Sequence, residues 1–109
     1  DRQLDAVWAE SIRQRVMVKL EAAYQSRGKA QLFTRLAALL EGRKLDRSYG
    51  ELAMELGVAK PVVHMEVLRL RERFRKEFRA EVAHTVTDAA QLEEEFRYLL
   101  SLLFGEDSP

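Results

Sequence analysis

Residues 48–63 read SYGELAMELGVAKPVV, and they predict two helices joined by a tight turn. Ser48 and Glu51 have the spacing of a capping box, in which each side chain accepts a hydrogen bond from the other residue's backbone N–H. Gly57 stands where the first helix ends, because glycine readily adopts the left-handed conformation that closes helices. Pro61 then falls in the first turn of the second helix, where its missing N–H costs no hydrogen bond.

Helical periodicity continues on both sides of this stretch, and the alternation typical of β-strands is almost nowhere visible. We therefore expect one all-α domain over residues 1–109, with five helices. The expected parts are a leading helix within 1–28 (from Arg2 to Ser26), a helical core over 29–83 with a helix-turn-helix at 48–79, and a C-terminal helix within 88–105. The core contains a second helix over 29–41 and an exposed polar connector over 43–47, whose Leu45 is expected near the core. Asp88 has the side chain of an N-cap for the last helix.

The apolar residues of the helices predict which faces are buried. In the leading helix the expected stripe is Leu4, Val7, Trp8, Ile12, Val16, Leu20 and Ala23. In the helix that begins near Pro61 the expected core positions are Val63, Val67, Leu70, Phe74 and Phe78. Val58 is expected to fill the angle between the two helices of the 48–63 stretch. Such stripes place one side of each helix against the core and leave the other side to solvent.

The composition excludes several classes of protein. The chain has no cysteine, so a disulfide framework, a thiolate metal site and a thiol nucleophile are excluded. Charged residues make up 33% and hydrophobic residues 47%, a balance that excludes an intrinsically disordered chain. No apolar run approaches the ~20 residues that span a bilayer, so we expect no membrane partner.

No pattern in the sequence predicts catalysis. His64 and His84 are too far apart for an i, i+4 ligand pair, and no acidic partner completes a metal site. No glycine-rich phosphate loop follows a strand, and paired carboxylates occur only at helical surface positions. We therefore expect no enzymatic activity, no metal and no cofactor.

Charge is segregated along the chain, although the formal net charge is zero. Between Lys60 and Arg79, seven basic residues face three acidic ones, which leaves about +4. From Asp88 onward, six acidic residues face Arg97 alone, which leaves about −5. A neutral total thus hides a basic middle and an acidic end.

This order of elements is typical of the helix-turn-helix: a short capped helix, a glycine turn and a longer basic helix. In that motif the second helix enters the DNA major groove. If the rear of this second helix is buried, its first turns face outward. The residues then available to base edges or nearby phosphates are Lys60, His64, Met65, Leu68 and Arg69. Arg71 and Arg75 are expected to contact the phosphate backbone.

The chain resembles the C-terminal promoter-reading domain, region four, of bacterial extracytoplasmic-function (ECF) sigma factors. The residues that carry the resemblance are 24–33 (YQSRGKAQLF), 48–53 (SYGELA), 68–75 (LRLRERFR), 81–86 (EVAHTV) and 92–99 (LEEEFRYL). The resemblance implies a cytoplasmic specificity factor of RNA polymerase that regulates transcription initiation. Its second motif helix would read the minus-35 promoter element, and its apolar flank would dock on the flap of the polymerase beta subunit. Anti-sigma factors bind such domains, so one is a further expected partner.

Three residues depart from the family pattern. Ala59 stands where many relatives have Ser or Thr, so the usual N-cap of the second motif helix is lost, at ~1 kcal/mol. Glu66 and Leu68 stand where relatives often carry a basic and a polar residue. A carboxylate at position 66 is expected near the phosphates, which it repels, although Glu can also accept a hydrogen bond from cytosine N4. The family's first domain is not among these residues, so we expect a fragment that does not initiate transcription alone.

Two other functions remain open from the residues alone. The long first and last helices, with their apolar faces, are also typical of a helical protein-interaction module. A different helix-turn-helix regulator would bind a palindromic site as a symmetric dimer.

Overall fold

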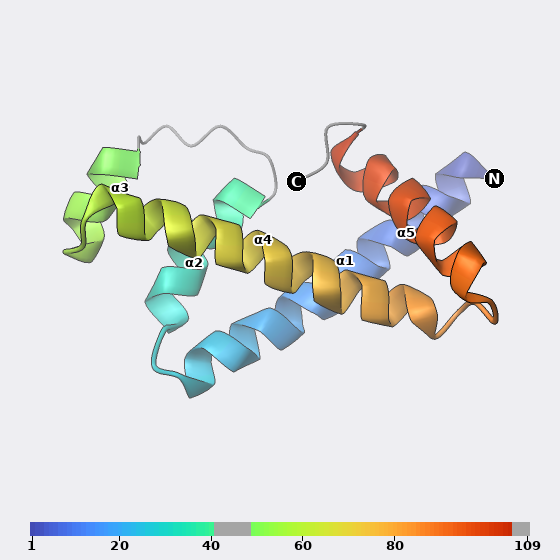
Figure 1. The fold of residues 1–109 in the computed structure, drawn as a ribbon, viewed down its shortest axis with the longest axis horizontal. Coiled ribbons are helices and arrows are strands. Elements are labelled where there is room, and N and C mark those ends of the chain that lie inside the picture. The colour runs from blue at the N-terminus through green and yellow to red at the C-terminus, as the bar shows by residue number, and fades with distance from the viewer. Residues whose placement is uncertain (41–48, 106–109) are drawn as a thin grey trace. The chain divides into compact units, whose positions relative to one another are not determined.

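The computed structural model describes residues 1–40 and 49–105, and within these ranges the chain is all-α, with five helices and no strand. The helices are α1 (Arg2–Ser26), α2 (Ala30–Leu40), α3 (Tyr49–Leu56), α4 (Lys60–Ala83) and α5 (Ala89–Phe104) (Figure 1). The predicted fold class is thus confirmed. Among these helices, none combines the length and the apolar character that crossing a membrane requires. The polar connector 43–47 with Leu45, and the Ser48 half of the capping box, lie outside the described residues.

The chain divides into two compact units, and α1 and α4 contribute to both of them. One unit is Glu21–Arg73; it holds the end of α1, helices α2 and α3, and the first half of α4. The other combines Asp1–Leu20 with the described part of Phe74–Pro109, and so holds most of α1, the second half of α4 and α5.

In the unit Glu21–Arg73, apolar side chains of α1, α2, α3 and α4 form the core. Its buried members are Tyr24, Phe33, Leu36, Leu40, Leu52, Ala53, Val63, Val67 and Leu70. The rings of Tyr24 and Phe33 lie 5.4 Å apart between centroids. The Tyr24 hydroxyl also accepts a hydrogen bond of 2.9 Å from Arg73 Nη1, so this large buried ring has a polar partner.

In the other unit, aromatic residues of α4 and α5 pack together. Phe78 lies between Phe74 and Phe96, at centroid distances of 5.7 and 6.2 Å, and all three are buried. The Asp88 carboxylate accepts a 2.9 Å hydrogen bond from the backbone N–H of Ala90, which confirms Asp88 as the N-cap of α5. Figure 1 shows α5 next to the last turns of α4.

The predicted stripe on α1 is wrong at its two ends. Leu4 and Val7 are each 69% exposed, and Ala23 is exposed as well, whereas the row that is buried continues from Leu20 to Tyr24. This row follows i, i+4 spacing from Ile12 through Val16, Leu20 and Tyr24, so it is one ridge of the helix rather than a broad stripe. The five predicted core positions of α4, from Val63 to Phe78, are all buried as expected.

Candidate nucleic-acid interface

The turn between α3 and α4 is closed by backbone hydrogen bonds, which fix how α4 begins. Gly57 has φ +69°, the left-handed conformation that the sequence predicted. The N–H of Val58 donates to the carbonyl of Ala53 at 3.0 Å, and the N–H of Gly57 donates to the carbonyl of Met54 at 3.2 Å. These are the two bonds of a Schellman motif, and they satisfy the carbonyls of Ala53 and Met54 near the end of α3.

The first half of α4 has a buried side and an exposed side. Val63, Val67 and Leu70 are at most 3% exposed and anchor the helix to the core of its unit. The predicted base-reading residues Lys60, His64, Met65 and Arg69 are all exposed, and so is Leu68 between them. Figure 1 shows α3 beside the first turns of α4.

His64 is supported by an aromatic neighbour from α3. Its ring meets the ring of Tyr49 edge to face, with centroids 4.3 Å apart and an interplanar angle of 83°. This contact links the start of α3 to the second turn of α4 and restricts the imidazole to a small range of orientations. A side chain held in this way loses little conformational entropy when it binds a ligand.

Glu66 does not lie where the sequence predicted. It was expected near the phosphates, but it is only 8% exposed, and its Oε1 accepts a hydrogen bond of 3.1 Å from Arg69 Nη1. A buried carboxylate needs such a partner because losing its water without compensation is costly. Arg69 is therefore both a predicted base-reading residue and the ion-pair partner of a buried acid.

The two predicted phosphate-contacting arginines differ from each other. Arg71 is half-buried, and its Nε is buried with no hydrogen-bond partner among the described residues, so only part of this side chain is open to solvent. Arg75 is exposed, and its guanidinium carbon lies 5.8 Å from the ring centroid of Phe96. Arg75 belongs to the other compact unit, whereas Lys60, His64, Met65, Arg69 and Arg71 share one unit.

An apolar groove beside α3 and α4 was not predicted. Its volume is about 300 Å³, and it is lined by Lys29, Leu32, Leu56, Val58, Val62, Val63 and Glu66. Val58, which was expected to fill the angle between the helices, is 40% exposed and lines this groove instead. The signal in the sequence was the three valines Val58, Val62 and Val63 close after Gly57, of which only Val63 is buried.

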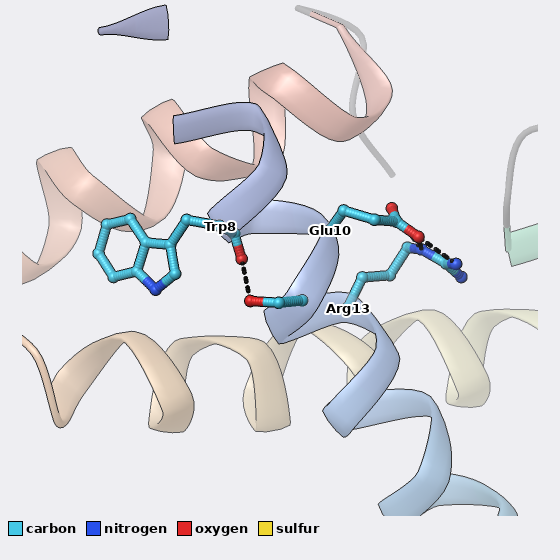
Figure 2. Close-up of polar contacts among 4 residues, drawn as sticks. Trp8, Glu10 and Arg13 are labelled. Carbon is cyan, nitrogen blue, oxygen red and sulfur yellow. Dashed lines mark hydrogen bonds and ion pairs between the residues drawn. The ribbon is translucent and has the colours of Figure 1, made fainter. Parts of the chain in front are cut away.

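Polar contacts near the start of α1 are local to the helix (Figure 2). Glu10 accepts hydrogen bonds of 3.0 and 2.9 Å from Arg13 Nε, and the Ser11 hydroxyl donates to the Trp8 carbonyl at 2.7 Å. The hydrogen bonds from Arg13 hold the pKa of Glu10 below its usual range, so this carboxylate is no proton donor near neutral pH. Trp8, which was expected in the core, is half-buried.

Two other groups have pKa values shifted by hydrogen bonds. Glu81 accepts from Lys19 Nζ, and this bond, with Arg15 nearby, lowers the pKa of Glu81. The Tyr98 hydroxyl donates to Asp5 Oδ2 at 2.8 Å, which raises the pKa of Tyr98. Both shifts come from structural pairs between helices. Over residues 1–40 and 49–105, no group of three His, Asp or Glu side chains is placed to hold a metal ion.

Comparisons with protein-family models, with curated proteins and with solved structures found no match to this chain. The candidate interface combines a closed turn after α3 with an exposed side of α4 that carries basic, imidazole and apolar groups.

Proposed function

We propose that the chain is the DNA-binding domain of a bacterial sigma factor of the extracytoplasmic-function class, and that the first half of α4 reads the minus-35 promoter element. One observation carries the proposal: Lys60, His64, Met65 and Arg69 are exposed together on a helix whose opposite side is buried. A recognition helix needs this division, because base edges are reached only by side chains that point away from the supporting core.

The chemistry of the exposed side suits a major groove. Arg69 offers the donors that pair with guanine, and Met65 and Leu68 offer apolar contact to thymine methyl groups. Lys60, at the first turn of α4, suits a phosphate contact that positions the helix. Glu66 does not take part in base reading directly, since it is buried.

We further propose that the chain docks on RNA polymerase through the apolar groove. Leu32, Leu56, Val58 and Val62 give it an apolar lining, and Lys29 gives it a basic residue. A partner segment with an apolar face, such as the flap of the beta subunit, fits such a lining. A protein with these partners works in the cytoplasm, where an anti-sigma factor is a further proposed partner.

The proposal is tested by selecting duplexes from a random pool with the 109-residue chain. Binding of the selected and scrambled duplexes is then followed by fluorescence anisotropy at several salt concentrations. For a monomer with about 3–5 phosphate contacts, the slope of log K against log salt should lie between about −3 and −4.5. Absence of binding to any duplex, with or without core polymerase present, would refute the proposal.

Two substitutions localise the interface. Lys60→Ala should weaken binding to all duplexes alike and make the salt slope shallower by about 1, because it removes one phosphate contact. His64→Ala should weaken binding to the selected duplex more than to the scrambled one. Arg97→Ala is the matched control, because Arg97 is an exposed basic residue on α5 and should not affect binding.

A helical interaction module is the second candidate, and a specific observation favours it. The large apolar side chains of Met54, Met65 and Leu68 are 84%, 48% and 62% exposed, so they are available to an apolar surface of a partner. Two results together would favour this candidate: self-association that does not depend on salt, measured by light scattering, and no binding to any duplex. Two protomers on a palindromic duplex would instead indicate a dimeric helix-turn-helix regulator.

A further inference from the structure

Glu66 and Arg69 form an ion pair between a buried acid and an exposed base one turn apart on α4. The Glu66 side chain is 11% exposed, and that of Arg69 is 51% exposed. Arg69 Nη1 donates to Glu66 Oε1 at 3.1 Å, in the order acid before base that favours a helical i, i+3 pair. The guanidinium is therefore tethered at one nitrogen, while much of the group faces solvent.

This tether leaves Arg69 able to recognise a base. A guanidinium has five N–H donors in a planar fork, and the described bond to Glu66 uses one of them. The remaining donors include those that pair with O6 and N7 of guanine. A tethered arginine also loses less side-chain entropy on binding than a mobile one, so more of its contact energy serves recognition.

Stability alone does not explain an acid at position 66. The side chain lines the apolar groove together with Val62 and Val63, where an apolar residue of similar size would also fit. Replacing a buried ion pair by well-packed apolar residues is often neutral or stabilising. Because this carboxylate contacts an exposed arginine on the proposed recognition surface, its effect on how that arginine binds explains its presence better than its effect on stability does.

We propose that Glu66 is a positioning residue that holds Arg69 in the orientation that reads a guanine edge in the major groove. The inference rests on the proposed DNA-binding function and adds a determinant of its specificity. The negative charge of Glu66 also opposes the attraction of Arg69 to phosphates. Glu66 should thus lower affinity for DNA in general and raise discrimination between sequences.

The test compares variants of the 109-residue chain on the selected duplex and on duplexes with each base pair replaced in turn. Glu66→Met keeps the length of the side chain and removes the hydrogen-bond acceptor. Glu66→Gln keeps an acceptor and removes the charge. Glu72→Gln is the matched control, because Glu72 is an exposed acid on the same helix with no ion pair among the described residues.

Glu66→Met should bind the scrambled duplex more tightly than the wild type does. Its discrimination between guanine and other bases at one position should fall by about fivefold, which is part of the discrimination that a bidentate base contact provides. Glu66→Gln should gain the same general affinity but keep more of the discrimination. Glu72→Gln should bind all duplexes more tightly and leave discrimination unchanged. In an Arg69→Ala background, Glu66→Met should change discrimination no further.

Three results would overturn the inference, and one of them also overturns the proposed function. Unchanged discrimination in Glu66→Met, or an equal loss with and without Arg69, would leave Glu66 with a structural role only. With unchanged discrimination, a structural role of Glu66 would appear only as a lower thermal midpoint of Glu66→Met. If the wild-type chain binds no duplex, the DNA-binding function and the role of Glu66 both fail. The first two results leave the DNA-binding function standing.

Discussion

Arg71→Lys should stabilise the protein, because it removes a buried N–H group from the side chain at position 71. Its Nε is buried and finds no hydrogen-bond acceptor among the described residues. A buried donor left unsatisfied costs about 1–3 kcal/mol. Lysine places a methylene group where arginine has Nε–H, and it keeps the positive charge at the end of the chain. The substitution therefore removes the unsatisfied donor with little other change.

We expect Arg71→Lys to raise the free energy of unfolding by about 1 kcal/mol, the low end of that cost, since the side chain is only half-buried. In a domain near this size, such a gain raises Tm by about 4 °C. Thermal and urea unfolding, followed by circular dichroism, measure both quantities. Arg97→Lys is the matched control at an exposed position and should leave Tm unchanged. A Tm equal to or below that of the wild type in Arg71→Lys would refute the reasoning, because it would mean that Nε is satisfied.

Two further predictions concern the core and the response to acid. Leu70→Asp should abolish the helical signal in circular dichroism, because Leu70 is 1% exposed and a buried unpaired carboxylate costs several kcal/mol of a total stability of about 5–15 kcal/mol. The control Leu68→Asp, at a 62% exposed position, should stay folded. A cooperative unfolding transition in Leu70→Asp would contradict the burial of Leu70. The hydrogen bond from Lys19 lowers the pKa of Glu81 below its usual 4.5, so its contribution to stability is complete above that pH and is lost as pH falls through the lowered pKa. Lys19→Met should therefore lower the free energy of unfolding at neutral pH, by an amount that shrinks below pH 4.5. Urea unfolding of the wild type and the variant over this pH range measures the difference. A difference that does not change with pH would show that the pair contributes nothing.

The helices and the buried side of α4 could be predicted because their signals are local. The spacing of Val63, Val67 and Leu70 follows the helical period, and all three are buried. Gly57 marks the end of α3 because its conformation depends on its own lack of a side chain. Asp88 caps α5 through a bond to a residue two positions away. Each of these features depends on neighbours in the sequence, so it needs no knowledge of the tertiary fold.

The buried face of α1 could not be predicted to the same degree. A helix of 25 residues with apolar residues on several sides has more than one possible ridge, and the neighbouring helices decide which one is covered. Tyr24 is buried, and its hydroxyl accepts a hydrogen bond from Arg73, 49 positions later in the chain. Leu4 and Val7 have the same apolar character as the buried residues and are nevertheless exposed.

The position of Glu66 illustrates a second limit of sequence-based prediction. Acidic residues are almost never fully buried unless they are paired, so a surface position near the phosphates was the natural expectation. Its burial depends on a charge pair with Arg69 and on the walls of the apolar groove. The i, i+3 spacing allows the pair, but the groove that buries Glu66 does not follow from the helical period, because its lining comes from α2, α3 and α4 together.

The same ion pairs change what the charge of α4 implies for DNA binding. The sequence counts seven basic residues from Lys60 to Arg79, but Arg69 pairs with Glu66 and Arg79 pairs with Glu93. A cation that already neutralises a carboxylate releases fewer counterions from DNA than a free one. We therefore expect a salt slope at the shallow end of the range from about −3 to −4.5. A slope of about −4.5 or steeper would show that both pairs open on the duplex, because the number of phosphates neutralised sets the slope.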